Sequence, residues 1–266
     1  MGRNVKGINV LSSFYVSARI GTEDYLRLPV CYELIKKTVH TCDPKTGKEK
    51  RQSPLTKNEL MRQMIVQQIN NQLSFKYILA DSWFSSNDNM RFIAKKKKVF
   101  IFDIKSNRLC AVNDEFRNKG QFTRIDELDI PKNTPMEVWL KDLELPVLLV
   151  KQVFTNKGQS IGVRFLVSND LMMSDDQFTT LYKKRWSVEE YHKSIKQNAS
   201  IGSSPAHSVK GQSNHLFAAI FSFVKLERIK LAKKMNHFAI KTKIYMAALR
   251  IALRELSQIK QNYISA

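Results

Sequence analysis

The sequence predicts an α/β fold with a mixed sheet, a strand-rich insertion and a helical C-terminal part. Short apolar runs at 75–80 and 99–105 contain almost no polar residues, which is typical of strands that are covered on both faces. Helix-start signals precede and separate these two runs. Between about 107 and 170, short strand patterns alternate with Pro, Asn and Gly turns.

The N-terminal elements follow from local patterns. Residues 7–18 and 26–38 are rich in Val, Ile, Leu and aromatic side chains around a turn at 21–24, so a β-hairpin is expected. A polar loop at 40–54 should follow. Thr56 and Glu59 form a T-x-x-E capping box, which predicts a helix with one apolar stripe that continues to about Leu73.

The middle and C-terminal elements are predicted in the same way. Ser86 or Asn87 caps a short helix that ends near Ile93, and Ser174 with Gln177 forms a second capping box. Two long amphipathic helices are expected at about 212–234 and 240–262. We therefore expect three parts: residues 1–106 and 171–266 form the core, and residues 107–170 form the β-rich insertion.

The composition excludes several classes of protein. With 266 residues, 43% of them hydrophobic, the chain has enough apolar material for a core, so a disordered chain is excluded. Its three cysteines are too far apart for a metal motif and too few for a disulfide scaffold, which favours a reducing cytoplasm. The longest apolar run, residues 216–224, is about half of what a membrane-spanning helix needs, so no membrane partner is expected.

The charge balance points to a polyanionic partner. Lys and Arg number 44 against 24 Asp and Glu, which gives a net charge of +20. Residues 181–266 hold 16 of the basic side chains and only four acidic ones, so a basic surface is expected on the C-terminal helices. Such a charge also suits an α/β protein of the cytoplasm that does not bind DNA.

Asp81 is the first candidate for a catalytic or ligand-binding residue. It follows the apolar run YILA directly, and ligands of open α/β sheets bind in the crevice outside the strand ends. A strand-end Asp also commonly begins a turn or caps a helix, and position alone favours that simpler role.

The second candidate is a helical pattern of four polar residues, Tyr182, Arg185, Glu189 and Lys196. On a continuous helix they fall within an arc of about 60°. A carboxylate flanked by Tyr, Arg and Lys suits a divalent metal next to phosphates. The alternative is an ordinary charged helix face, and Ser187 with Glu190 could also start a new helix and break the arc.

The pattern Y-x2-R-x3-E-x6-K resembles the YREK signature of bacterial insertion-sequence transposases of the DDE type, whose catalytic core is ribonuclease H-like. In that family a catalytic Asp follows a buried strand, a β-rich insertion comes next, and the signature Glu lies on the helix after it. Asp81, residues 107–170 and Glu189 match in that order, so the resemblance covers nearly the whole chain.

The resemblance implies metal-dependent DNA cleavage and strand transfer with two Mg²⁺ or Mn²⁺ ions. It makes Asp81 and Glu189 catalytic metal ligands and gives Tyr182, Arg185 and Lys196 contacts with DNA phosphates. The implied partners are transposon ends, target DNA, and a second copy of the chain or a full-length transposase.

The start of the chain departs from the family pattern. The first catalytic Asp lies on a first core strand that should precede a strand like residues 7–18, and this chain begins at that second strand. Asp24 and Asp103 do not match the missing position. We therefore expect that the chain is a truncated copy or has a misassigned start, and that it is inactive alone because it cannot complete a two-metal site. The alternative is a non-catalytic DNA-binding remnant that inhibits a full-length transposase.

Overall fold

The computed structural model describes residues 9–18, 25–42, 44, 46–155, 158–206 and 208–264. The chain divides into two compact units. The first, which we call the hairpin unit, comprises Met1–Leu34 and Ser187–Ala266. The second, which we call the sheet unit, comprises Ile35–Trp186.

The sheet unit is built on a seven-stranded mixed sheet with the order β5-β6-β11-β10-β9-β7-β8. Its strands are β5 (Tyr77–Ala80), β6 (Val99–Ile104), β7 (Leu109–Ala111), β8 (Thr123–Arg124), β9 (Met136–Leu140), β10 (Val147–Thr155) and β11 (Ile161–Ser168). β5 and β6 are parallel, and the other pairs are antiparallel. The predicted mixed α/β fold is confirmed. Within the described residues, β5 pairs only with β6 and forms one edge of the sheet.

The segment predicted as a β-rich insertion does contain strands, with a short helix α3 (Asp114–Asn118) and a 3₁₀ turn η1 (Ile125–Glu127) between them. These strands do not form a separate sheet. β11 pairs with β6 from Phe165 opposite Ile104 to Ser168 opposite Ile101, so the insertion extends the sheet that begins with β5. Continuous backbone pairing therefore links the insertion to the strand that precedes Asp81.

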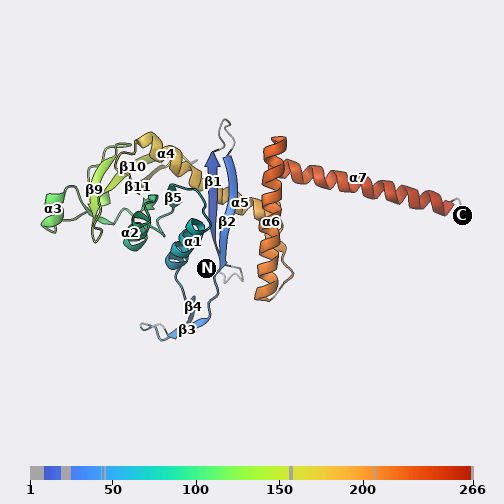
Figure 1. Cartoon of the computed structure of the whole chain (residues 1–266), viewed down its shortest axis with the longest axis horizontal. Helices are drawn as coiled ribbons and strands as arrows, with labels where there is room; N and C mark the ends of the chain where they lie inside the picture. Colours follow the sequence, from blue (N-terminus) through green and yellow to red (C-terminus); the bar gives the residue numbers. More distant parts are fainter. Residues whose placement is uncertain are drawn as a thin grey trace. The chain divides into compact units, whose positions relative to one another are not determined.

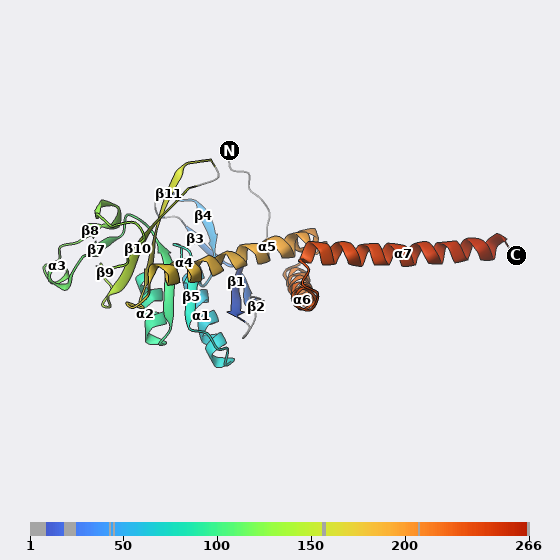
Figure 2. The same cartoon turned by 90° about the horizontal axis from the view of Figure 1, so that it is seen from above.

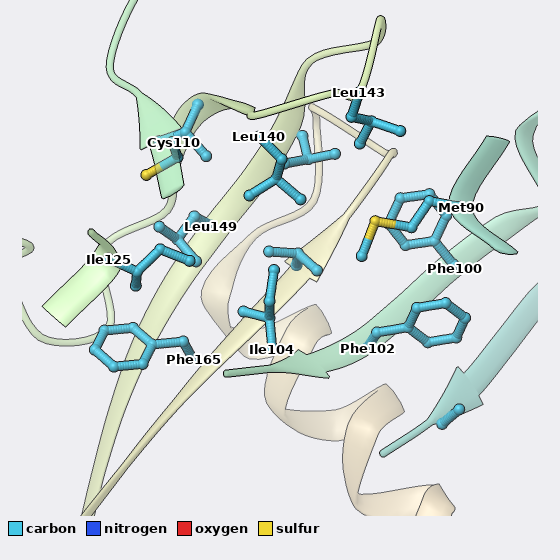
Figure 3. Packing of buried hydrophobic residues seen from close by; sticks show 14 of the residues in the cluster. Met90, Phe100, Phe102, Ile104, Cys110, Ile125, Leu140, Leu143, Leu149 and Phe165 are labelled. Carbon is cyan, nitrogen blue, oxygen red and sulfur yellow. The ribbon is translucent and has the colours of Figure 1, made fainter. Parts of the chain in front are cut away.

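Helices cover both faces of this sheet (Figure 1). α1 (Lys57–Asn70) and α2 (Asn87–Lys95) pack on one face, and Figure 3 shows part of that core around Met90, Phe100 and Phe102. α4 (Asp175–Lys183) packs on the other face through Phe178 and Tyr182. All three predicted caps are present, because Thr56, Ser86 and Ser174 each accept a hydrogen bond from the third residue of their helix.

The residues predicted as a polar loop at 40–54 include a small exposed hairpin. β3 (Val39–Cys42) and β4 (Glu49–Gln52) pair antiparallel from Val39 opposite Gln52 to Cys42 opposite Glu49. Polar residues alone did not indicate strands here. Because the ladder depends on backbone hydrogen bonds and its side chains are mostly solvated, the sequence carries little apolar alternation.

The hairpin unit contains the antiparallel pair β1 (Val10–Ala18) and β2 (Tyr25–Leu34), as predicted. Its helical part runs through α5 (Ser187–Gln197), a 3₁₀ turn η3 (Ile201–Ser203), α6 (Val209–Lys233) and α7 (His237–Ile264). Tyr191, Leu216 and Phe223 form its core with Phe14 and Tyr32. The apolar face of α6 thus packs on this two-stranded sheet, and Figure 2 shows α6 beside β2. Among the described residues, no helix combines the length and the apolar character that a membrane crossing demands.

Candidate active site

Asp81 lies directly after the last residue of β5 and is exposed. Its Oδ1 accepts a hydrogen bond of 3.0 Å from the backbone N–H of Trp83, and its carbonyl accepts one of 3.1 Å from the N–H of Phe84. The residue therefore starts a tight turn, which is the simpler role that position favours. That turn leaves the carboxylate at the C-terminal end of a parallel strand, where α/β sheets bind ligands.

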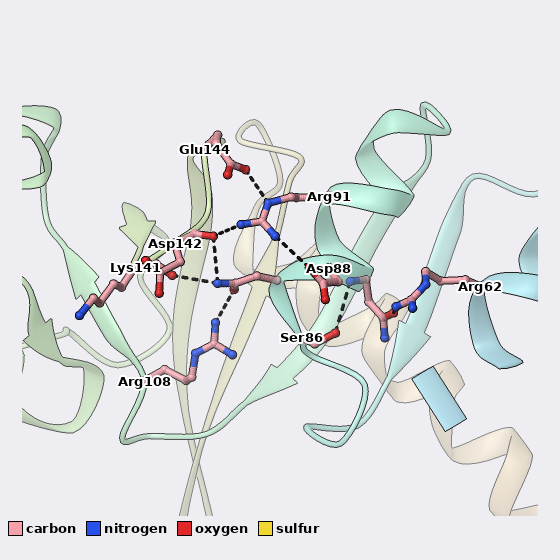
Figure 4. Close-up of polar contacts among 10 residues, drawn as sticks. Arg62, Ser86, Asp88, Arg91, Arg108, Lys141, Asp142 and Glu144 are labelled. Carbon is pink, nitrogen blue, oxygen red and sulfur yellow. Dashed lines mark hydrogen bonds and ion pairs between the residues drawn. The ribbon is translucent and has the colours of Figure 1, made fainter. Parts of the chain in front are cut away.

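A polar network surrounds the start of α2, which follows the loop that begins at Asp81 (Figure 4). Asn89 is fully buried, donates to the carbonyl of Phe84 at 2.9 Å, and accepts from Arg62 at 2.7 Å. Arg108 donates to the carbonyl of Ser85 at 3.1 Å and also to the side chain of Asn87. Since buried amide and guanidinium groups are costly to leave unpaired, these bonds restrict the loop that carries Asp81.

Asp103 is the neighbour of Asp81 on the adjacent strand. The parallel register places Ala80 opposite Phe102, so the next residues, Asp81 and Asp103, follow side by side. Burial raises the pKa of the Asp103 carboxyl, and the charge of Asp81 adds to this effect, whereas Arg164 and Arg185 oppose it. Two carboxylates and two guanidinium groups thus share one end of the sheet.

Tyr182 anchors α4 over the same end of the sheet. Its side chain is only 3% exposed, and its hydroxyl donates to the carbonyl of Ala80 at 3.4 Å. Arg164 and Arg185 lie over its ring, 5.0 and 5.6 Å from the centroid. Burial, reinforced by the Asp103 carboxylate, raises the pKa of Tyr182 to about 12. The phenol is therefore neutral at pH 7 and donates inside the protein.

Arg164 is held in place by a chain of side-chain hydrogen bonds. Its Nε donates to the side chain of Gln152 at 2.9 Å, and Gln152 in turn donates to Thr179 of α4 at 2.8 Å. Gln152 is buried, so this chain joins β10, β11 and α4 next to the guanidinium. A guanidinium fixed close to carboxylates can bind a phosphate that bridges to a metal on those carboxylates.

The donor set partly fits a divalent cation. Asp81 and Asp103 supply carboxylate oxygens, which Mg²⁺ and Mn²⁺ prefer. In the part of the chain that the structure describes, however, no group of three or more His, Cys, Asp or Glu side chains is arranged for a metal. The sheet unit thus brings together two carboxylates of the kind that bind divalent cations.

The segment that carries the four-residue pattern stays helical, but it is not one uniform helix. α4 ends at Lys183, a 3₁₀ turn η2 covers Lys184–Trp186, and α5 begins at Ser187. Tyr182 therefore lies on α4, Arg185 in the 3₁₀ turn, and Glu189 and Lys196 on α5. A 3₁₀ turn has a larger rotation per residue than an α-helix. The four side chains therefore do not follow the rotation of 100° per residue from which their common arc was predicted.

α5 presents Glu189 on its exposed side. The next residue, Glu190, is paired with Arg27 of β2, and Tyr191 is buried against Phe14 and Phe223, with centroid distances of 5.0 Å to each. The burial of Tyr191 between these two rings fixes the rotation of α5. Lys196 is exposed two turns after Glu189 and so lies on the same face.

His192 lies between Glu189 and Lys196 on this face. Burial lowers the pKa of His192, Glu189 raises it and Lys196 lowers it further. A lowered pKa favours neutral His192 at pH 7, and the exposed ionisable side chains on this side of α5 are Glu189, Lys193 and Lys196.

The sequence-predicted residues thus fall into two sets. Asp81, Tyr182 and Arg185 come together in the sheet unit, and Glu189 and Lys196 share one face of α5 in the hairpin unit. Convergence of Asp81 and Glu189 on one metal centre stays a prediction. Sequence reasoning missed Asp103 and Arg164 as neighbours of Asp81. Asp81 directly follows the first apolar run and Asp103 lies near the end of the second, and this likeness could have indicated Asp103. The position of Arg164 depends on the pairing of β11 with β6.

Comparison with known proteins adds an independent finding. The family described as "Transposase DDE domain" matches residues 37–224. A cryo-EM structure of piggyBac transposase in a synaptic complex with hairpin DNA is similar over 90% of this chain, with 13% sequence identity and a TM-score of 0.41. This chain spans about half of that transposase, 51% of its length. No curated protein matches the sequence.

Proposed function

Because the chain belongs to the transposase DDE-domain family, we propose that it serves metal-dependent cleavage and strand transfer of DNA in transposition. The observation that carries the proposal is the extent of the family match. Residues 37–224 include Asp81, the strands that follow it and the helices that bear Tyr182, Arg185, Glu189 and Lys196. The cytoplasm is the proposed compartment, since the proposed substrate is DNA.

In this proposal Asp81 and Glu189 hold divalent cations, Mg²⁺ or Mn²⁺, and the complete site has two of them. Such ions neutralise charge on the attacking and leaving oxygens of a phosphodiester. Arg185 and Lys196 bind DNA phosphates, since both are cationic and partly or fully exposed. Tyr182 was predicted to contact phosphate as well, but its burial favours a different task, in which the ring seats Arg164 and Arg185.

We further propose that the chain binds DNA but does not cut it alone. The sheet unit offers two neighbouring carboxylates, and only Asp81 matches the family motif there. A site with two carboxylates binds a divalent cation far more weakly than a site with three. In this state the chain can occupy transposon ends or join a full-length transposase without completing the reaction, which would make it inhibitory.

A nicking assay on supercoiled plasmid with Mg²⁺ or Mn²⁺ tests the catalytic part. The purified chain should leave the plasmid intact. Nicking that disappears in Asp81→Asn and Glu189→Gln, but persists in Asp88→Asn and Glu190→Gln, would show that the chain suffices and would overturn the proposed inactivity. The two control positions are exposed acids on α2 and on α5, outside the proposed site.

Metal binding and DNA binding are measured separately. Titration with Mn²⁺ followed by paramagnetic resonance should show weak binding that Asp81→Asn reduces and Asp88→Asn does not. Anisotropy with a random 40-base-pair duplex should show binding that weakens steeply with salt. Absence of DNA binding at low salt would instead favour an α/β protein with some other role.

A further inference from the structure

Arg164 lies outside the four-residue pattern, but its position in the sheet brings it to the two neighbouring carboxylates. It lies on β11, directly opposite Gln152 on β10, and Leu166 of the same strand is opposite Asp103 on β6. Residues that are opposite in antiparallel strands, or two apart on one strand, point to the same face of a sheet. Gln152, Arg164 and Asp103 therefore share the face that α4 covers, where Leu166 packs.

These residues continue a polar row that begins at Asp81. The sheet order β5-β6-β11-β10 puts their four strands next to one another, so Asp81, Asp103, Arg164 and Gln152 follow one another across the sheet. Burial raises the pKa of the Asp103 carboxyl, and the positive charge of Arg164 is the largest influence that lowers it. A guanidinium group therefore lies next to the carboxylates at the end of the sheet where Asp81 is found.

Two aromatic rings orient this guanidinium. Its carbon atom is 5.0 Å from the ring centroid of Tyr182 and 5.4 Å from that of Phe154. Phe154 is opposite Gly162, and a Cβ atom at Gly162 would lie 2.5 Å from the Phe154 ring, so the ring lies directly against the strand. The glycine thus lets Phe154 remain beside Arg164. Contacts with ring faces hold a guanidinium without using its hydrogen-bond donors.

The hydrogen bonding of Arg164 leaves most of its donors free. Its Nε donates to Gln152, which is 6% exposed and is itself held by Thr179. Among the described residues, the two terminal nitrogens of Arg164 have no hydrogen-bond or ion-pair partner. Arg164 is partly exposed and Phe154 is 42% exposed, so a ligand can reach this group. Terminal guanidinium nitrogens form a planar fork that matches two oxygens of a phosphate.

We propose that Arg164 binds a phosphate group of the substrate through its two terminal nitrogens, and that Gln152 is a positioning residue that holds the guanidinium for this contact. The inference rests on the proposed function, since DNA supplies the phosphate, and it deepens that function. It adds a phosphate contact from the strands of the insertion to the contacts proposed for Arg185 and Lys196. A guanidinium that is already oriented loses little conformational entropy when it binds.

The direct test follows the Nε–H signal of Arg164 by nuclear magnetic resonance, in the full chain with isotope-labelled arginine. Arg164→Lys identifies this signal by removing it. Inorganic phosphate is the probe, chloride at equal ionic strength is the control, and Mg²⁺ is present to screen the two carboxylates. Phosphate should shift the Arg164 signal saturably and shift that of Arg124, which is paired with Asp126, much less. An Arg164 signal that responds equally to phosphate and to chloride would overturn the proposal.

Arg164→Lys tests the contact with DNA at constant charge. Lysine lacks the planar fork, so the variant should bind a random duplex about 5-fold more weakly at one salt concentration. Arg124→Lys is the matched control and should bind as the unsubstituted chain does. Equal affinity of Arg164→Lys and the unsubstituted chain would mean that Arg164 does not contact the DNA. If the unsubstituted chain binds no DNA at low salt, the proposed function fails instead, and the phosphate titration still decides the role of Arg164.

A double-mutant cycle tests the positioning role of Gln152. Gln152→Met removes the acceptor of Arg164 Nε and keeps a similar side-chain volume. This change should weaken duplex binding by the unsubstituted chain but have no further effect on Arg164→Lys, because both substitutions disable the same contact. Equal losses of affinity in the two backgrounds would show that Gln152 does not act through Arg164. Circular dichroism checks that each variant is folded.

Discussion

Glu227 is a buried carboxylate of the hairpin unit, with only 2% of its surface exposed. Lys230 Nζ lies 2.9 Å from one of its oxygens, and His237 Nε2 lies 2.9 Å from the other. His237 Nδ1 is in turn 2.8 Å from the hydroxyl of Ser194. This chain joins α5, α6 and the first residue of α7, so it fixes where α7 begins.

The pH dependence of stability should reveal this carboxylate. Burial tends to raise the pKa of Glu227, but the bonds from His237 and Lys230 outweigh it and hold the pKa below the usual 4.5. A lowered folded-state pKa contributes stability that is present above the unfolded-state value and is lost as pH falls. We expect Glu227→Gln to cost about 1.5–3 kcal/mol at pH 7 and to remove this loss below about pH 4.5.

Urea unfolding of both proteins at pH 7 and pH 3.5, followed by circular dichroism, measures this effect. The difference between wild type and variant should shrink at the lower pH. A difference that is the same at both pH values would mean that the Glu227 charge contributes no stability.

Tyr182→Phe separates the two roles considered for this residue. The hydroxyl donates to Ala80 inside the protein, so its removal should cost about 0.5–1.5 kcal/mol of unfolding free energy and leave duplex affinity unchanged. Urea unfolding and fluorescence anisotropy at one salt concentration give the two quantities. Lower DNA affinity with unchanged stability would support the predicted phosphate contact instead.

At the scale of elements, local signals were sufficient and long-range pairing was not. Thr56 with Glu59, and Ser174 with Gln177, predicted helix starts correctly because a capping box is closed within four residues. The hairpin β3–β4 was missed, since its ladder rests on backbone bonds. Asp81 and Asp103 are neighbours because of the register of β5 with β6. Arg164 comes close to them because of the register of β11 with β6. No local sequence pattern encodes these registers.

The capping box of α1 should be worth a measurable part of the stability of the sheet unit. Thr56 accepts from the N–H of Glu59 at 3.2 Å, and its own N–H donates to the Glu59 carboxylate at 2.7 Å. Thr56→Ala should therefore lower the free energy of unfolding by about 1 kcal/mol, whereas Thr56→Ser should keep most of the stability that the cap contributes. Thermal unfolding of the three proteins measures this. If Thr56→Ser loses as much as Thr56→Ala, the hydroxyl is not the stabilising group.

At the scale of the whole molecule, a net charge of +20 attracts any polyanion, so affinity for DNA alone does not identify a binding surface. The salt dependence is more informative because it counts the phosphates that are neutralised. Each phosphate contact contributes about 0.9 to the slope of log affinity against log salt concentration. Comparing pairs of lysines and arginines with equal charge but different positions therefore separates contacts from general attraction.

Arg185→Gln combined with Lys196→Gln should reduce that slope by about 2, if both side chains contact phosphates as proposed. Lys95→Gln combined with Lys96→Gln removes the same charge from exposed residues at the end of α2, and should leave the slope nearly unchanged. Anisotropy titrations of a random 40-base-pair duplex between about 50 and 300 mM salt measure both. Equal reductions of the slope by the two double variants would mean that charge alone drives binding. A larger reduction by the α2 variant would mean that the DNA binds to a surface other than the one that carries Arg185 and Lys196.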